Sequence, residues 1–198
     1  NLGTPDSTKV SDVRKYLREF LMDKRVVDIP YVLRWILVNL IIVIFRAPKS
    51  AAEYRKLFTE RGSPLKFYTE DLTAMVHKKL AKDYAVEFGM RYQSPSIEEA
   101  IKRLMVQHVS EIKVMPLFPQ YASATTGSVI DKVMELTKQW QIIPKISFVS
   151  QFFHHPLLIE TIVDQAQPFL KAHDYDHYLF SYHGLPERQI RKGSVAKH

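Results

Sequence analysis

The chain has 198 residues, no cysteine and a hydrophobic share of 46%. This length and this apolar content predict a folded protein with a packed core, and intrinsic disorder is not expected. The absence of cysteine excludes disulfides, thiolate zinc sites, iron–sulfur ligation and a cysteine nucleophile within these residues. It also fits a reducing compartment.

Positive charge gathers in the first third of the chain. Residues 1–66 carry 13 Lys and Arg against 7 Asp and Glu, and residues 67–198 carry 15 against 14, which gives the net charge of +7. Such a region can face nucleic acid, an anionic membrane or an acidic small molecule. Nucleic acid is not expected, because no run of five like charges and no ladder of basic and aromatic residues occurs. A solvated basic face is the commonest alternative.

The first elements are predicted to be helices. Apolar residues recur at helical spacing over Ser11–Leu21, and the run Tyr31–Phe45 is apolar apart from Arg34 and Asn39. This run is too short for a membrane span of about 20 residues, so we expect a buried helix. The alternative is an apolar lip that touches a membrane or a flat apolar ligand.

Two further helices are predicted before residue 82. Ser50 with Glu53 forms a capping-box pattern that predicts a helix start. The sequence Arg61-Gly62-Ser63-Pro64 predicts a helix end at Gly62, followed by a new helix with Ser63 as N-cap.

From there on, strands and helices alternate. The predicted strands are 86–92, 111–117, 142–149 and 177–181, and the predicted helices between them are 97–105, 128–137 and 156–170. Alternation of this kind favours an α/β fold, in which a parallel sheet has helices on both faces.

His183 follows the last predicted strand, just before Gly184 and Pro186. Ligands of open α/β sheets bind beyond the carboxyl ends of the strands, where a histidine can reach them. Taken alone, this position is explained slightly better by a histidine that only caps or packs in a loop.

Familiar nucleotide and hydrolase motifs are absent. The two closest glycines, Gly184 and Gly193, are 9 positions apart, which rules out both GxGxxG and a Walker loop. HExxH and GxSxG do not occur either. A phosphate loop without further glycines remains open at Thr125–Ser128, where an ordinary helix start is the commoner explanation. The remaining features suit a flat, apolar, acidic ligand.

Four stretches carry a family resemblance: Asn1-Leu2-Gly3-Thr4-Pro5, Arg61-Gly62-Ser63-Pro64-Leu65, Pro116–Ser128 (PLFPQYASATTGS) and Leu179–Pro186 (LFSYHGLP). In content and order they resemble ferrochelatase, the enzyme that inserts ferrous iron into a porphyrin. The resemblance implies a chelatase-like fold of two Rossmann-like halves, each a parallel sheet flanked by helices. Residues 1–142 would form the first half with the lip of the porphyrin pocket. Residues 143–198 would begin the second half, which we expect to be truncated, with the chain a fragment at both ends.

By this resemblance, His183 is the catalytic histidine that faces the porphyrin centre, as a base or as a ligand of the iron. Leu2, Arg46, Ser63 and Phe118 would bind the substrate, a porphyrin dicarboxylate, with Arg46 and Ser63 at its propionates. The alternatives are a chelatase for another metal or tetrapyrrole, and a porphyrin- or haem-binding protein without turnover.

The resemblance also bears on cofactors and location. Ferrous iron is the substrate, and no Fe–S cluster is expected, because Ser123 stands where some members have a cluster cysteine. The family pairs its histidine with a glutamate that would lie beyond His198. The lip predicts peripheral membrane contact of a cytoplasmic protein, and the oligomeric state stays open.

Overall fold

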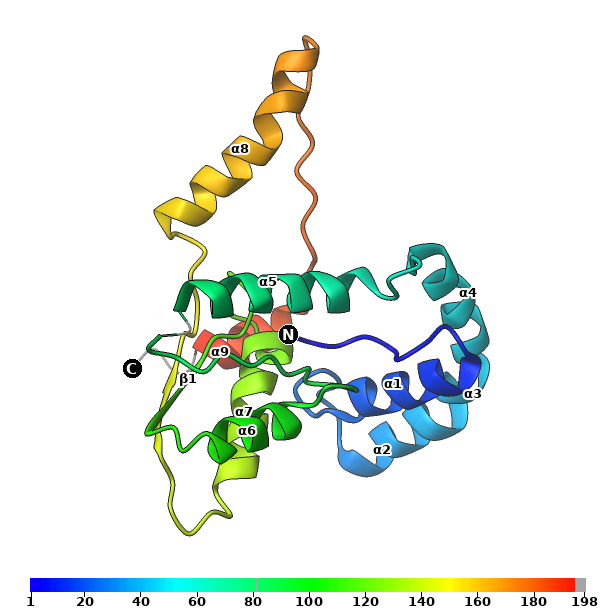
Figure 1. Cartoon of the computed structure of the whole chain (residues 1–198). Coiled ribbons are helices and arrows are strands. Elements are labelled where there is room, and N and C mark those ends of the chain that lie inside the picture. The colour runs from blue at the N-terminus through cyan, green and yellow to red at the C-terminus, as the bar shows by residue number, and fades with distance from the viewer. Residues whose placement is uncertain (81, 195–198) are drawn as a thin grey trace.

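The computed structural model describes residues 1–80 and 82–194 and shows a mixed α/β arrangement (Figure 1). The helices before the first strand are α1 (Val10–Met22), α2 (Tyr31–Ile36), the π-helical η1 (Leu37–Ile42), α3 (Val43–Phe45), α4 (Ala47–Leu57), α5 (Pro64–Leu80) and α6 (Ile97–Val106). Then follow β1 (Glu111–Val114), the π-helical η2 (Ser123–Gly127), α7 (Ser128–Thr137), β2 (Lys145–Phe148), α8 (Pro156–Ala172) and α9 (Glu187–Ser194).

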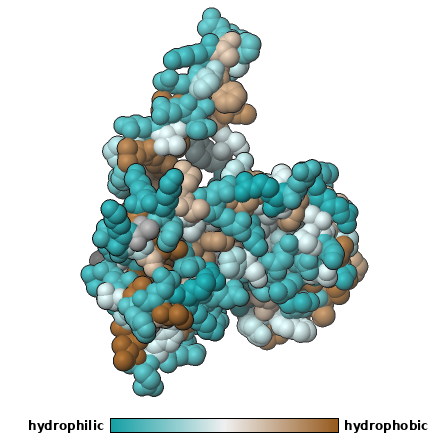
Figure 2. All heavy atoms as spheres, in the orientation of Figure 1, coloured by the Kyte–Doolittle hydropathy of each residue, from teal (hydrophilic) through white to brown (hydrophobic). Residues whose placement is uncertain are grey.

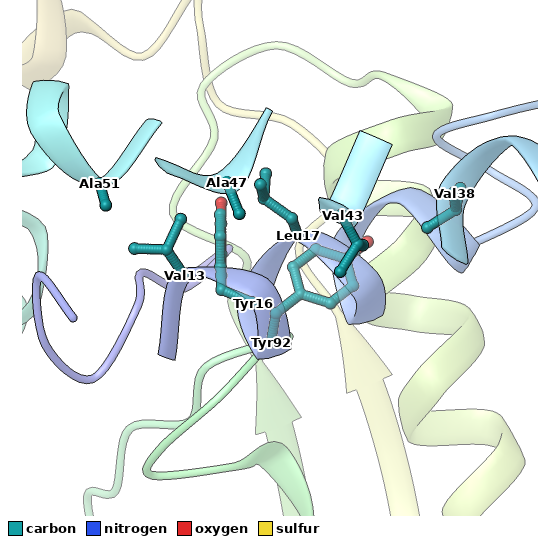
Figure 3. Packing of buried hydrophobic residues seen from close by; sticks show 8 residues of the cluster. All are labelled: Val13, Tyr16, Leu17, Val38, Val43, Ala47, Ala51 and Tyr92. Atoms are coloured by element: carbon teal, nitrogen blue, oxygen red, sulfur yellow. The ribbon is translucent and has the colours of Figure 1, made fainter. Parts of the chain in front are cut away.

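A first core forms where α1 packs against the α3–α4 segment. Its buried residues are spaced three and four positions apart on α1 and recur at similar spacing on the facing helices (Figure 3): Val13, Tyr16, Leu17, Val38, Val43, Ala47, Ala51 and Tyr92. The small Ala side chains of α4 allow the two helices to approach closely. Tyr92 joins this core from a distant segment and so ties the middle of the chain to its beginning.

A second core lies between the sheet and the helices α6 and α7. β1 and β2 pair in parallel, with Glu111 opposite Lys145 and Val114 opposite Phe148. The buried side chains between sheet and helices are Ile97, Ile101, Ile112, Val129 and Val133. This arrangement confirms the predicted α/β class with a parallel sheet. The sheet has two strands among the described residues and is smaller than the alternation suggested.

The predicted strand at 86–92 is wrong as a regular strand. The segment is extended, but it forms only single bridges, between Gly3 and Tyr92 and between Met90 and Ser96. Two local features limit the pairing. Pro5 has no N–H to continue the ladder beyond Gly3, and Gln93 adopts a φ of 66°, which lies outside the strand region.

The predicted strand at 177–181 is also wrong. These residues are extended and exposed, with Leu179 exposed to 96% and Phe180 to 77%. A strand requires a neighbour that accepts and donates main-chain hydrogen bonds. No strand in the described part of the chain pairs with this segment, so its apolar residues have no sheet to join.

The run Tyr31–Phe45 is helical as expected, but it is not a buried helix. Val38 and Val43 face the first core, whereas Tyr31, Leu33 and Phe45 are exposed to 63%, 58% and 74%. The neighbouring helices α1 and α4 cover only one side of it. Among the described residues, no single helix is long and apolar enough to cross a membrane. Tyr31–Phe45 and Ala47–Leu57 are together long and apolar enough, but the chain bends by 60° between them.

The helix α8 projects from the body as an arm that extended segments join at both ends (Figure 1). None of its residues is buried, and Figure 2 shows apolar side chains on the surface of this arm. The boundary predicted between residues 142 and 143 stays a prediction. The strand β2, just after it, pairs with β1 of the preceding region.

Candidate functional site

Leu2 is held on the body by main-chain hydrogen bonds. Arg91 N donates to Asn1 O at 2.8 Å, and Tyr92 N donates to Leu2 O at 2.9 Å. Gly3 has a φ of +114°, and a Cβ at this position would lie 2.0 Å from Tyr92 O, so only glycine allows the approach. The half-buried Leu2 side chain packs against the first core. Its position is therefore fixed by the chain on both sides of it.

Ser63 lies next to the same N-terminal segment. It is buried, immediately precedes α5, and donates from its hydroxyl to Thr4 Oγ1 at 2.9 Å. Its carbonyl oxygen accepts from Lys66 N and Phe67 N, which begins the helix. The structure thus brings Ser63 within one hydrogen bond of the segment that carries Leu2. An anion at Ser63 would require the hydroxyl to turn away from Thr4.

Arg46 lies at the 60° bend between Tyr31–Phe45 and Ala47–Leu57. Its side chain is exposed. Burial raises the pKa of Tyr54, and the hydrogen bond with Tyr16 and the positive charge of Arg46 partly offset this rise. An exposed guanidinium at a bend can meet an anionic group from solvent without losing a protein partner.

Phe118 lies in the loop after β1, at the carboxyl end of the parallel strands. It is half-buried and packs against the second core, and its N donates to Pro116 O at 2.8 Å. Phe152 N donates to Pro119 O at 2.9 Å, which joins this loop to the segment after β2. Phe118 therefore stands at the edge of the sheet where ligands of α/β proteins bind.

The loop after Phe118 continues into η2 and α7 and is braced by Arg25. Arg25 Nε donates to Asp131 Oδ2 at 3.0 Å, and Nη1 donates to Ser123 Oγ at 3.5 Å. The hydrogen bond to Asp131 raises the pKa of Arg25 and lowers the pKa of the Asp131 carboxyl. One side chain thus contacts both the first residue of η2 and the first turn of α7.

A buried polar network was not found by the sequence analysis. The Asp23 carboxylate accepts from Arg91 Nη2 at 2.7 Å, from the Tyr92 hydroxyl at 2.9 Å and from the Ser128 hydroxyl, and its side chain is only 5% exposed. Burial alone would raise the pKa of Asp23, but the hydrogen bonds from Ser128, the Arg25 amide and Tyr92 outweigh it and lower that pKa. The carboxylate therefore stays ionised and joins three distant segments.

Each member of this network looked unremarkable in the sequence. Asp23 follows the last apolar residue of a helix, Ser128 begins another, and Arg91 and Tyr92 lie on a segment predicted as a strand. A charged residue at a helix end is usually solvated. One signal in the sequence could have indicated a buried charge. The alternation in 86–92 places Arg91 between Met90 and Tyr92, which are both buried.

A cavity of about 570 Å³ opens beside this network. It is lined by Met22, Asp23, Lys24, Arg34, Arg91, Asp131, Met134, Glu135 and Lys138. None of the five predicted site residues lines it. The cavity and the predicted site are therefore separate features of the molecule.

His183 lies in the extended segment between α8 and α9 and is exposed. The structure does not bring it into contact with Leu2, Arg46, Ser63 or Phe118. Among the described residues, no cluster of three or more His, Asp and Glu side chains could hold a metal ion.

Comparison with known proteins decides the family. A sequence model described as Ferrochelatase matches residues 1–195. The chain belongs to the ferrochelatase family. A ferrochelatase of Legionella pneumophila (strain Paris) is 44% identical over 192 residues, which cover 97% of this chain and 57% of the relative.

Other relatives give the same result. A ferrochelatase of Bdellovibrio bacteriovorus is 44% identical over the same shares, and one of Coxiella burnetii (strain Dugway 5J108-111) is 42% identical over 97% of this chain and 53% of its own length. This member of the ferrochelatase family therefore spans little more than half the length of the curated relatives it matches. The resemblance expected from the four motifs is confirmed.

Proposed function

We propose that the protein inserts ferrous iron into a porphyrin dicarboxylate and releases haem, which is the reaction of a metal chelatase of the lyase class. One observation carries the proposal. The family match spans residues 1–195 and so includes His183 together with the loop that holds Phe118, and the matched relatives are named ferrochelatases.

The proposed role of His183 follows from what metal insertion requires. The porphyrin must lose two pyrrole protons, and the iron must lose water ligands. A histidine side chain titrates near neutral pH, so it can take a proton or bind a divalent metal there. The exposure of His183 leaves both ring nitrogens accessible for either role. A pocket that bends the macrocycle toward its metallated shape would favour the transition state over the flat substrate.

The proposed substrate contacts divide into apolar walls and anion partners. Leu2 and Phe118 are half-buried apolar side chains on ordered segments, which suits the faces of a flat ring. Arg46 offers an exposed charge to a propionate. Ser63 offers a hydroxyl once its O–H turns from Thr4 Oγ1, 2.9 Å away. No Fe–S cluster and no nucleic acid form part of this proposal.

Peripheral membrane contact of a cytoplasmic protein is proposed for the exposed side of Tyr31–Phe45. Its support is the exposed apolar surface there, which includes Val32 at 66% and Phe45 at 74%. Co-sedimentation with phosphatidylglycerol vesicles tests it, with Phe45→Ser as the variant and Leu157→Ser on α8 as the control. Equal binding of both variants and the parent would refute membrane contact at this surface.

Metal insertion tests the proposed reaction. The assay follows the visible absorbance of a dicarboxylate porphyrin with ferrous iron, in this chain and in the longest natural polypeptide that contains it. We expect His183→Ala to abolish turnover while His177→Ala, an exposed histidine on the same segment, leaves it unchanged. Turnover with another metal only would favour the other chelatases. Porphyrin binding without turnover in any form would favour a carrier.

A further inference from the structure

The predicted substrate contacts are divided between the two hydrophobic cores. Leu2 packs against the first core, whereas Phe118 packs against the second. The two cores have no side chain in common. The distance between Leu2 and Phe118 therefore depends on the contacts that join one core to the other.

Polar side chains just after α1 make such contacts. Asp23 accepts from the Ser128 hydroxyl at the start of α7, and its other carboxylate oxygen accepts from Arg25 N at 2.7 Å. An aspartate that accepts from the amide two residues on closes a tight turn of the backbone. The Arg25 side chain therefore leaves the loop from a defined point.

The guanidinium of Arg25 meets one side of η2 and α7. Nε donates to Asp131 Oδ2 at 3.0 Å, and Nη1 donates to Ser123 Oγ at 3.5 Å. A Cβ at Gly127 would lie 3.3 Å from the same Nη1, so a glycine here leaves room for the guanidinium. Residues 123, 127 and 131 follow one another at intervals of four, which places them along one side of the helical segment. Arg25 thus spans η2 and the first turn of α7.

The start of η2 has no cap of its own. Its N-cap residue is Ala122, whose side chain cannot accept a hydrogen bond, and no side-chain cap is present there. Asp131, in the first turn of α7, suits the positive end of the helix dipole. Because Arg25 pairs with this carboxylate and also reaches Ser123, it holds the segment at a point where the local sequence gives little support.

Charge alone does not explain an arginine at this position. Lys24 Nζ lies 3.6 Å from Asp131 Oδ2, so a second cation already stands beside this carboxylate. A lysine ends in one ammonium group, whereas the planar guanidinium of arginine carries several N–H donors in a fixed arrangement. The guanidinium can therefore pair with Asp131 and reach Ser123 at the same time.

We propose that Arg25 is a positioning residue that fixes η2 and α7 to the first core and thereby sets the distance between the predicted substrate contacts Leu2 and Phe118. The proposal rests on the proposed function only for the roles of Leu2 and Phe118. The attachment itself is a property of the fold and can be measured without substrate.

Hydrogen–deuterium exchange tests the attachment in the longest natural polypeptide that contains this chain. The amides of Thr125 and Gly127 donate to Ala122 O at 3.2 and 3.0 Å, so their exchange reports on the opening of η2. We expect Arg25→Ala to speed exchange of a peptide over residues 119–127 by about fivefold, which is the effect of losing one partly exposed ion pair. A peptide from α6 should exchange as in the parent. Unchanged exchange over 119–127 would overturn the proposal.

Porphyrin affinity then tests the positioning role. Fluorescence quenching of a dicarboxylate porphyrin gives Kd, in samples whose folded state is checked by circular dichroism. We expect Arg25→Ala to raise Kd by about fivefold. Arg25→Lys should raise it as much, because the charge is kept but the contact with Ser123 is lost. A parental Kd for Arg25→Lys would overturn the proposal, since charge alone would then suffice.

A double variant and a matched control complete the test. Arg25→Ala combined with Asp131→Ala should raise Kd no more than Asp131→Ala alone, because the two side chains act as a pair. Arg103→Ala removes the pair of Arg103 Nε with Glu87 Oε2, 2.7 Å apart, and should leave Kd unchanged. Effects of the two single variants that multiply in the double variant would overturn the proposal.

The positioning role and the proposed function fail in different ways. Faster exchange over residues 119–127 beside a parental Kd for Arg25→Ala would refute the positioning role and leave the proposed function intact. A parent protein that binds no porphyrin would refute both, while the exchange experiment would still decide whether Arg25 attaches η2.

Discussion

The helices α7 and α8 show that an apolar helix face is buried only where another surface meets it. α7 has 10 residues, and its Val129 and Val133 are exposed to only 4% and 1% against the sheet and α6. α8 has 17 residues, yet its Leu157 and Ile162 are exposed to 64% and 56%. Periodicity thus predicts the helix, whereas burial depends on a partner surface that the helix itself does not encode. Residues 1–148 contain both cores, whereas no described residue between 149 and 192 is buried.

Truncating a core side chain should give the largest difference in the free energy of unfolding between residues 1–148 and residues 149–192. Leu17→Ala removes a side chain that is 7% exposed in the first core and should lower the free energy of unfolding by about 2–5 kcal/mol. Leu157→Ala on α8 should change it by less than about 0.5 kcal/mol. Urea unfolding of both variants measures this. Equal losses would show that α8 is packed in solution.

The buried network should come next in size. Asp23→Asn removes a charge that accepts from Arg91, Tyr92 and Ser128, and should lower the free energy of unfolding by about 1–3 kcal/mol. The control is Asp71→Asn, which weakens the exposed pair with Arg61 and should cost no more than about 1 kcal/mol. The same urea unfolding measures both. A smaller loss for Asp23→Asn than for Asp71→Asn would contradict the network.

The pH dependence of stability should reveal the same carboxylate. The pKa of Asp23 is lower in the folded than in the unfolded protein, so its contribution is present above its unfolded pKa, about 3.9, and is lost as pH falls through the folded value. Urea unfolding between pH 6 and pH 3 should show a shallower loss of stability for Asp23→Asn than for the parent. Parallel curves would mean that Asp23 titrates normally.

The smallest difference is expected at the helix starts. Ser96 and Glu99 form a complete capping box at α6, whereas His155 makes no side-chain cap at α8. Ser96→Ala should lower the free energy of unfolding by about 1 kcal/mol, and His155→Ala should leave it unchanged. Thermal unfolding of the two variants compares them. A loss of stability for His155→Ala alone would mean that His155, and not Ser96, caps its helix.

Local patterns predicted the helices well and the strands poorly. The capping box at Ser96 is confirmed, but the one expected at Ser50 is wrong, because α4 begins at Ala47 with Pro48 in its first turn, and Ser50 lies inside it. The segments 86–92 and 177–181 alternate or are apolar as strands are, yet a strand also needs a neighbour in register. That neighbour is distant in sequence, so no local pattern can supply it.

In the candidate site, too, local features could be predicted from the sequence and long-range contacts could not. The motifs and the family they resemble could be predicted from the sequence, because glycine, proline and histidine positions are local information. The Asp23 network and the contact of Arg25 with Asp131 could not, because each joins residues more than 60 positions apart. The buried state of Arg34, which donates to Val27 O and Ile29 O, likewise ran against the expectation for a charged residue.

In the proposed reaction, the N-terminal body binds the porphyrin, and His183 on the exposed segment takes part in the insertion of the iron. The most direct test measures porphyrin affinity by fluorescence quenching and insertion rate in one sample of His183→Ala. We predict parental affinity with no detectable insertion, whereas Arg46→Ala should bind more weakly. Loss of porphyrin binding in His183→Ala, or parental insertion by this variant, would contradict the account.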